Sequence, residues 1–449
     1  MTEPLLARKL CREARPIAGA ADLDALIGLC GSARYVLLGE ATHGTREFYR
    51  LRVEISRRLI TEQGFDAIAV EADWPDALQA SRYVQHAGSD RTADHALSGF
   101  ERFPQWMWRN VEMIALLDWL RAHNGRNEQP PVGFYGIDLY SLRKSIYAVI
   151  DYLETADPVA ARRARARYAC FDHIAVDTQQ YGVATSLGMQ HDCEQQVIRQ
   201  LAELSQLAAG HVRESGDGLV PDDLFYAQQN ARVVQNAESY YRVMFSSRDQ
   251  SWNQRDSHMA DTLEQLHAHL SAKLQRPARI VVWAHNSHLG DARHTEMGWD
   301  GQLNVGQLMR ERCGEEQVFI LGFTTHSGTV SAASAWDAPV ELKTVLPAPP
   351  DSIEGLLHEV AVMLRSNCLL LPLRARHSAL AELGTPLLER AIGVIYRPQT
   401  ERLSHYFQAH PARQFDAIVH VDQSSALQPL EYSVRWRPGE VEETYPSGL

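Results

Sequence analysis

The sequence predicts an α/β fold: a central, mostly parallel sheet flanked by helices, with a large helical insertion that forms a cap or a side bundle. Short apolar runs recur along the chain, and most are followed by a turn and a segment with helical periodicity. The runs are continuously hydrophobic rather than alternating, which is typical of strands buried on both faces of a parallel sheet. The clearest expected strands are 35–39, 67–70, 132–137, 279–284 and 318–322, and further candidates are 368–371, 392–396 and 417–421.

The expected helices show apolar residues spaced by three and four. After the first strand, Phe48, Ile55 and Leu59 share one face, and residues 139–153 repeat the pattern after the third strand. Residues 224–244 and 259–270 predict two longer amphipathic helices, and no convincing strand lies between about 139 and 275. We therefore expect the chain to have three parts. They are the first part of the α/β core at 1–138, a helical insertion at 139–275, and the second part of the core at 276–449.

Composition narrows the class of protein. Of 449 residues 45% are hydrophobic, which is enough for a large core and excludes a disordered chain. The 44 basic and 56 acidic residues give a net charge of −12, which argues against nucleic acid as the main partner. Six cysteines without a C-x-x-C pair are too few for a disulfide scaffold and favour a reducing compartment. With no signal-peptide pattern and no membrane-length apolar run, we expect a soluble, cytoplasmic protein that does not bind membranes.

The most informative feature is where polar residues fall. Five expected strands each have ionisable or hydroxyl groups just past their last apolar residue. If these strands are parallel, their carboxyl ends meet at one edge of the sheet, where α/β proteins bind ligands. The residues singled out there are Glu40, His43, Glu71, Trp74, Asp138, His285, Asn286, His288 and Thr325.

His43 is the expected general base. It lies between a strand and a helix that Thr45 is expected to cap, with Gly44 easing the turn. The positive helix end disfavours the imidazolium ion and a nearby carboxylate favours it, and these opposed effects leave a neutral imidazole near pH 7 that suits proton removal from water. Glu40, three residues earlier, and Glu71 on the neighbouring strand are expected to orient the ring or the water.

Other residues complete the expected site. Arg52 either neutralises the carboxylates or binds an oxyanion, and His285 donates a hydrogen bond to developing negative charge or a proton to a leaving group. The residues expected to bind substrate are His288, Asp138, Trp74, Asn286 and Thr325.

Each of these residues also has a purely structural interpretation. Glu40 and Arg52 form an ordinary ion pair in that view, Asp138 caps a helix, and His288 is a polar loop residue. Three further histidines on or near a helical surface are expected to be solvated: His258, His267 and His269.

Several catalytic signatures are absent from the sequence. It contains no G-x-S-x-G, no H-E-x-x-H, no G-x-x-x-x-G-K-[ST] and no G-x-G-x-x-G motif, and no cysteine lies in the strand-end set. The spacings E-x-x-H at 40–43 and H-x-x-H at 285–288 are only weak indications of a metal site.

At these residues the sequence resembles the erythromycin esterase family. The matching stretches are VLLGEATHGTREFYRLR (36–52), AVEADW (69–74), RFPQWMWRN (102–110), YGIDLYS (135–141), SWNQRDSHMADTL (251–263) and VVWAHNSHLGD (281–291). The resemblance implies an α/β fold with a helical part, and hydrolysis of a macrolide lactone ester by water that a histidine activates without a covalent acyl-enzyme. It also implies that His43 is the general base, and that the other active-site positions are Glu40, Arg52, Glu71, His285 and His288.

The leading hypothesis is therefore a carboxylic-ester hydrolase without a cofactor or metal. Its expected partner is a small-molecule ester or lactone, either a macrolide, which would link the protein to antibiotic resistance, or another natural product. The segment at 168–188 looks like that of an uncharacterised branch of the family, so the resemblance does not fix the substrate. The alternatives are a metal- or haem-binding protein and a non-catalytic small-molecule sensor that use the same pocket.

Overall fold

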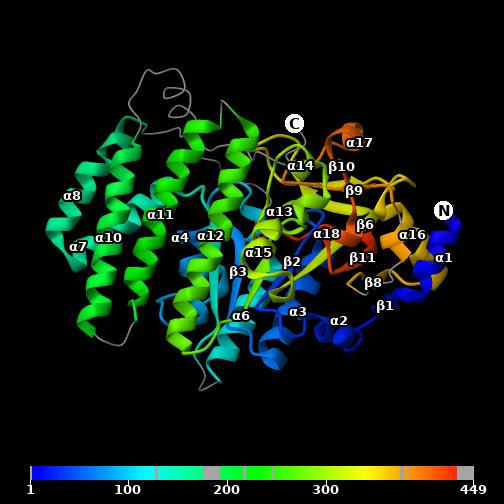
Figure 1. The fold of residues 1–449 in the computed structure, drawn as a ribbon, viewed down its shortest axis with the longest axis horizontal. Helices are drawn as coiled ribbons and strands as arrows, with labels where there is room; N and C mark the ends of the chain where they lie inside the picture. Colours follow the sequence, from blue (N-terminus) through cyan, green and yellow to red (C-terminus); the bar gives the residue numbers. More distant parts are fainter. Residues whose placement is uncertain are drawn as a thin grey trace.

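A computed structural model describes residues 3–126, 130–174, 193–215, 219–244, 247–374, 379–382 and 384–431. Its centre is a nine-stranded sheet in which six consecutive strands are parallel, in the order β11–β6–β2–β5–β3–β4, with β4 at the edge (Figure 1). Every residue of β2, β3, β4 and β5 is buried, as their continuous hydrophobicity predicts. The bounds of the six are β2 Tyr35–Leu38, β3 Ala67–Asp73, β4 Gly133–Asp138, β5 Ile280–Trp283, β6 Val318–Ala332 and β11 Ala417–Ser424.

The remaining strands are antiparallel and lie toward one side of the sheet. β8 pairs with β11, β1 pairs with β8, and β7 pairs with the far half of β6, whereas β9 and β10 form a separate hairpin. Their bounds are β1 Arg15–Pro16, β7 Glu341–Val345, β8 Cys368–Pro372, β9 Leu387–Arg390 and β10 Tyr406–Ala409. The α/β class with a mostly parallel sheet is thus confirmed.

The prediction of a strand at 392–396 is wrong. This run is buried, but it is irregular backbone that makes only isolated bridges, from Ile392 to Thr42 and from Ile395 to Ala333. A short apolar run predicts that a segment is buried, but burial alone does not determine whether that segment pairs with a neighbouring strand.

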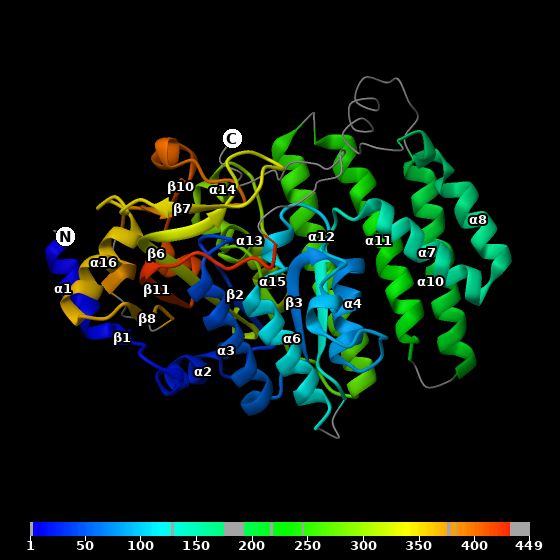
Figure 2. The same cartoon turned by 180° about the vertical axis from the view of Figure 1, so that it is seen from behind.

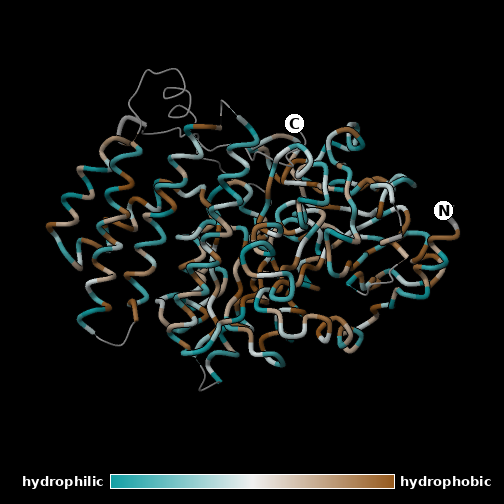
Figure 3. The backbone as a smooth tube through the Cα atoms, viewed as in Figure 1, coloured by the Kyte–Doolittle hydropathy of each residue, from teal (hydrophilic) through white to brown (hydrophobic). Residues whose placement is uncertain are grey.

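Helices cover both faces of the sheet, and the alternation of side chains along each strand divides the core in two. Val36 and Val281 face the side covered by α2 (Asp24–Cys30), α3 (Arg46–Gln63) and α6 (Val111–Asn124). Leu37 and Val282 face the opposite side, covered by α1 (Glu3–Glu13), α12 (Arg248–Leu274), α15 (Val305–Cys313) and α16 (Ile353–Leu364). The hydrophobic colouring concentrates in this central region (Figure 3).

The helical insertion forms a side bundle at one end of the molecule (Figures 1 and 2). It contains α7 (Leu142–Ala156), α8 (Pro158–Tyr168), α10 (Glu194–Ser215) and α11 (Asp222–Val243), and its own core includes Leu153, Leu204 and Val234. In the described parts of 139–275 there is no strand. The bundle meets the sheet through α12, which packs on both α11 and β4, and through α4 (Trp74–Val84), which contacts α11.

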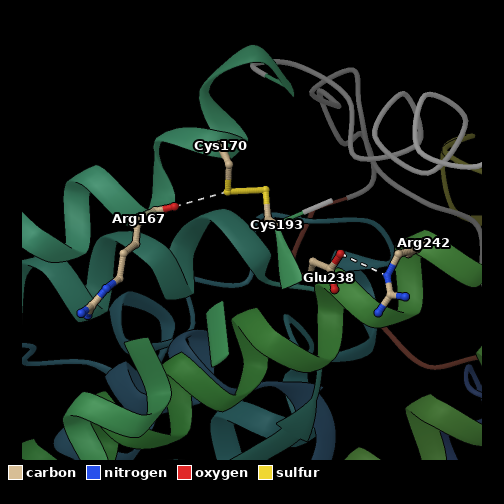
Figure 4. The surroundings of a disulfide bond; sticks show 5 residues. All are labelled: Arg167, Cys170, Cys193, Glu238 and Arg242. Atoms are coloured by element: carbon tan, nitrogen blue, oxygen red, sulfur yellow. Dashed lines mark hydrogen bonds and ion pairs between the residues drawn. A yellow bond between two sulfur atoms is a disulfide. The ribbon is translucent and has the colours of Figure 1, made fainter. Parts of the chain in front are cut away.

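Cys170 and Cys193 form a disulfide in this bundle (Figure 4). It joins the 3-10 turn at Ala169–Ile174 to the residue before α10. The sequence predicts no disulfide framework, and a separation of 23 residues without a motif gives no local signal for this pair. Residues 175–188 of the segment singled out at 168–188 lie outside the described residues.

Short elements connect the rest. The short helices are α5 (Ala93–Ala96), α13 (Asn286–Leu289), α14 (Glu296–Trp299), α17 (Glu401–Ser404) and α18 (Pro411–Gln414). Further 3-10 turns are η1 (Ala20–Leu23), η2 (Gln105–Met107), η4 (Ala292–His294), η5 (Glu315–Gln317), η6 (Ala379–Glu382) and η7 (Pro398–Thr400). Among the described residues, no helix combines the length and apolar character that crossing a bilayer requires.

The expectation that His258 is solvated is wrong. Its ring is buried on α12, with Nδ1 2.7 Å from the amide nitrogen of Asn236 and Nε2 3.5 Å from the Thr262 hydroxyl. Burial lowers the pKa of His258 to about 4, against the opposing effect of Asp138.

His258 should make folding stability fall in mild acid. The unfolded chain binds a proton at this ring below about pH 6.5 while the folded chain does not, so the free energy of unfolding decreases by about 2 kcal/mol between pH 6.5 and 5. Urea unfolding of the wild type and of His258→Gln at both pH values measures this decrease. The free energy of unfolding of the variant should depend less on pH, because the buried histidine is no longer present. His95→Gln, at a ring that is 75% exposed, is the matched control, and an unchanged slope in His258→Gln would contradict the assignment.

Candidate active site

Four loops or strand ends bring the predicted acidic and imidazole groups to one edge of the sheet. Glu40 and His43 follow β2, Glu71 lies within β3, Asp138 ends β4, and His285 follows β5. All of these side chains are buried. The structure therefore places groups from four parallel strands within contact distance of one another.

Two glycines allow the β2 segment to approach its neighbours this closely. A Cβ added at Gly39 would lie 2.1 Å from the side-chain oxygen of Asn286, and one added at Gly44 would lie 1.8 Å from the carbonyl oxygen of Ser331. The backbone N–H of Asn286 donates to the Glu40 carbonyl at 2.8 Å, which ties the β5 end to the β2 end. Glycine is needed here for space rather than for an unusual backbone angle.

His43 belongs to a chain of three charged or polar groups. Its Nδ1 lies 2.9 Å from Oε1 of Glu40, and Arg52 donates from Nη2 to Oε2 of the same carboxylate at 2.7 Å. The Arg52 guanidinium is stacked over Tyr49 and Trp283, at 4.5 and 4.8 Å from their ring centres. Glu40 is thus held on both oxygens, and it fixes the His43 ring through Nδ1.

Glu71 links the second half of the site. Its Oε2 accepts the backbone N–H of His285 at 2.9 Å, and its Oε1 accepts from Nη2 of Arg255 at 2.8 Å and lies 3.2 Å from Nε2 of His288. Burial by itself would raise the pKa of Glu71, but the positive charges of His288 and Arg255 outweigh it and hold the pKa well below its usual range. Glu71 is therefore an ionised carboxylate at neutral pH.

Arg255, on α12, also holds Asp138. It donates from Nε to Oδ1 at 3.0 Å and from Nη2 to Oδ2 at 2.6 Å, which makes a bidentate ion pair between buried groups. Asp138 in addition accepts the N–H of Leu139 at 2.8 Å. The interpretation of Asp138 as a helix cap is wrong, because α7 begins at Leu142 with Ser141 at its N-cap, and the main contact of Asp138 is the ion pair with Arg255.

His288 is a permanently charged member of the site. Its Nδ1 lies 2.6 Å from Asp256 on α12, and its ring stacks on Trp252 at 4.4 Å between centroids. Burial opposes the charge, but the carboxylates of Asp256 and Glu71 raise the pKa of His288 to about 10. This ring therefore stays an imidazolium ion throughout the neutral range.

His285 is the opposite case. Its ring lies 4.9 Å from the His43 ring, centre to centre, and burial lowers its pKa well below the usual value, with a further lowering when His43 is protonated. Nδ1 accepts the backbone N–H of Ser287 at 3.2 Å, so the single proton of the neutral ring belongs on Nε2. Nε2 is buried and makes no hydrogen bond within the described residues. The backbone carbonyl of Ala41 acts on the pKa of the ring against the effect of burial, but does not outweigh it.

The side chains of three predicted substrate-binding residues make their contacts outside this network. Trp74 packs among Tyr135, Phe225 and Tyr226 at the junction with the helical bundle. The Asn286 amide donates to the Phe323 carbonyl at 2.8 Å. The carbonyl of Thr325 accepts from Arg390 at 2.7 Å, toward the far side of β6.

Arg255 and Asp256 are the functional residues that sequence reasoning missed. They lie on α12, 184 and 32 residues away along the chain from the partners they bind, Glu71 and His288. A signal was present: both interrupt the buried stripe of an amphipathic helix that continues through Trp252 and Met259, and charged residues in such a stripe require buried partners.

The acidic and imidazole side chains of the site give little support to the alternative that the protein binds a metal ion. Among the described residues, no group of three or more His, Cys, Asp or Glu side chains is arranged to hold a metal ion. The carboxylates of Glu40, Glu71 and Asp138 are instead bound by the guanidinium groups of Arg52 and Arg255, which would compete with a cation.

Comparison with known proteins identifies the family. The family model for erythromycin esterase matches residues 60–424. The chain belongs to the erythromycin esterase family. It is 22% identical over 367 residues to the putative hydrolase YbfO of Bacillus subtilis (strain 168), covering 77% of each protein. It is 26% identical over 325 residues to the erythromycin esterase type II of Escherichia coli, covering 69% of this chain and 73% of that one.

The fold is also that of a solved erythromycin esterase. The enzyme EreC, determined as a mutant in its open conformation, superposes with a TM-score of 0.62 at 18% identity, covering 92% of this chain and 98% of that one. The resemblance found in the sequence is thus confirmed. Membership of the erythromycin esterase family, together with the similarity to a putative hydrolase, indicates a hydrolase.

In this erythromycin esterase family protein, Arg255 should be critical for stability. Arg255→Met leaves Glu71 and Asp138 buried without their main counter-charge, so the free energy of unfolding should fall by about 3–5 kcal/mol. Urea unfolding at pH 7 measures the change. The exposed pair Arg402–Asp351 is the control, since Arg402→Met should cost less than about 1 kcal/mol. Equal, small losses in both variants would contradict the role of Arg255.

Proposed function

We propose that this protein is a carboxylic-ester hydrolase that cleaves an ester or lactone bond with a water molecule activated by His43. The observation that carries the proposal is the buried chain Arg52–Glu40–His43 next to the neutral ring of His285. It supplies a fixed base beside a hydrogen-bond donor, and these are the two requirements for direct hydrolysis.

His43 acts as the general base in this proposal. Because Nδ1 is bonded to Glu40, proton transfer takes place at Nε2. Nε2 removes a proton from water while the water oxygen attacks the carbonyl carbon, which gives a tetrahedral intermediate with a negatively charged oxygen. The C–O bond of the ester then breaks, and the imidazolium ion returns the proton to the alkoxide that leaves. No acyl-enzyme forms, in keeping with the absence of a nucleophile elbow.

His285 stabilises the oxyanion. Its Nε2 carries the ring proton and is buried without a partner in the described part of the chain, so its hydrogen bond is available to a charge that develops during the reaction. Arg52 is less suited to this task, because its guanidinium is bound to Glu40 and enclosed by Tyr49 and Trp283. Of the two donors that the sequence leaves open, the geometry favours His285.

Glu71 has a positioning role. It fixes the backbone of His285 through Oε2, and it is held in turn by Arg255 and His288. The donor on His285 is therefore oriented before substrate binds, which lowers the cost of reorganisation in the transition state.

A small-molecule ester or lactone is the proposed substrate. The printed name of the Escherichia coli relative makes macrolides the first compounds to test, and with them a role in antibiotic resistance. Purified protein is assayed against macrolides and a panel of simple esters and lactones.

His43→Ala should lower kcat/KM for whichever ester is hydrolysed by about 10²- to 10⁴-fold, because the general base is lost. His269→Ala is the matched control: it removes another histidine paired with a carboxylate, Asp222, outside the site. Thermal unfolding of both variants verifies that they fold. Equal activity of His43→Ala and the wild type would overturn the proposal.

His288 should leave the pH dependence of the reaction unchanged between pH 6 and 9. With a pKa of about 10 it stays protonated over this whole interval, so its charge is constant. His288→Gln should lower kcat about tenfold by loosening Glu71 while the shape of the kcat/KM profile stays the same. An apparent pKa between 6 and 9 that disappears in His288→Gln would show that His288 itself titrates there.

A further inference from the structure

A pocket with aromatic walls, open to solvent, adjoins the candidate active site on the side of β3 and β4. Its lining shares Glu71, Asp138 and Arg255 with the site, so a molecule in the pocket lies next to the residues that hold His285 and His288 in place. Its walls are aromatic: Phe100, Phe103, Trp108, Tyr140 and Trp336.

Asp73 supplies an unused acceptor in this pocket. It is the N-cap residue of α4, yet its carboxylate accepts no hydrogen bond from the helix N–H groups. Arg102 donates from Nε to Oδ2 at 3.1 Å, while Oδ1 is buried and makes no hydrogen bond within the described residues. The side chain is only 4% exposed. An Asp at this position normally caps the helix, so the unpaired Oδ1 of this pocket-lining residue leaves a cost of about 1–3 kcal/mol that a ligand can offset.

Trp336 supplies an unused donor in the same pocket. Its indole ring meets Phe103 edge to face, with centroids 5.0 Å apart and an interplanar angle of 64°. Nε1 is buried and likewise makes no hydrogen bond in the described part of the chain. Buried tryptophan N–H groups usually find an acceptor, so this one points to a ligand atom.

Each carboxylate around the pocket faces a basic group, and Arg255 serves both Glu71 and Asp138. Arg102 faces Asp73, and Lys144 donates to Asp76 at 2.9 Å. Arg255 faces Asp138. A pocket with paired charges, one free acceptor and one free donor suits a neutral group that both donates and accepts. A hydroxyl group does both, whereas an ammonium group only donates.

We propose that this pocket binds a neutral hydroxylated ring of the substrate, of the sugar or cyclic polyol class. A ring hydroxyl donates to Oδ1 of Asp73, another accepts from Nε1 of Trp336, and the C–H faces of the ring lie against the aromatic walls. The assignment rests on the proposed function in that it names the part of the ester that is recognised, next to the bond that His43-activated water cleaves.

Binding is measured first, because it does not depend on hydrolysis. Calorimetric titration of the wild type uses the methyl glycosides of glucose, mannose and rhamnose, which contain no ester, with methoxycyclohexane as the ring without hydroxyl groups. We expect saturable binding of at least one glycoside and at least tenfold weaker binding of methoxycyclohexane. Asp73→Asn should weaken glycoside binding about 10- to 100-fold and Trp336→Phe about 5- to 10-fold.

Trp106→Phe is the matched control. Its Nε1 is also buried without a hydrogen bond among the described residues, but Trp106 does not line the pocket. It should bind the glycosides as the wild type does. The proposal is overturned if no glycoside binds, if methoxycyclohexane binds as tightly as the glycosides, or if Asp73→Asn leaves their affinity unchanged.

Hydrolysis of acetylated methyl glycosides and of cyclohexyl acetate then separates the two proposals. If the glycosides bind in an Asp73-dependent way but neither acetate is cleaved, the pocket assignment stands and the hydrolase proposal loses these substrates. If cyclohexyl acetate is cleaved in a His43-dependent way while no glycoside binds, the hydrolase proposal stands and the pocket assignment falls.

Discussion

The candidate site depends on the compensation of buried carboxylates by two buried arginines. Glu40, Glu71 and Asp138 lie at one sheet edge with almost no exposure to water, and each alone would cost several kcal/mol to keep ionised there. Arg52 holds Glu40, and Arg255 holds both Glu71 and Asp138. The planar guanidinium group can serve two carboxylates at once in fixed directions, which a lysine cannot do. These contacts keep the acids charged and therefore keep the histidines oriented.

The same arrangement divides two neighbouring histidines into opposite roles. His288 lies between Asp256 and Glu71, and their charges outweigh the effect of burial and raise its pKa. His285 touches Glu71 only through its backbone N–H, and burial lowers its pKa. One ring is thus a structural cation and the other a neutral donor, although both belong to one four-residue motif. The difference arises because two carboxylates face the His288 ring, whereas Glu71 binds only the backbone of His285.

The helical insertion contributes to the chemistry as well as to the shape. Its last helix, α12, extends from the bundle across the sheet and brings Arg255 and Asp256 to the strand ends. The parallel sheet supplies the acids and the imidazoles, and α12 supplies the charge that balances them. The aromatic pocket next to them is formed mainly by the segments that follow β3 and β4, together with Trp336 after β6.

Continuous hydrophobicity was sufficient to predict the central strands. Five residues at the predicted strand ends also indicated that their side chains share one edge of the sheet: Glu40, His43, Glu71, Asp138 and His285. Both predictions succeed because strand direction and side-chain spacing are local properties of the sequence. The tertiary structure alone decided the rest. It left 392–396 as irregular backbone, joined Cys170 to Cys193, directed Trp74 toward the bundle, and paired Arg255 with a carboxylate 184 residues away. The physical reason is that hydropathy and periodicity determine whether a residue is buried, whereas its partner depends on which distant segments pack around it.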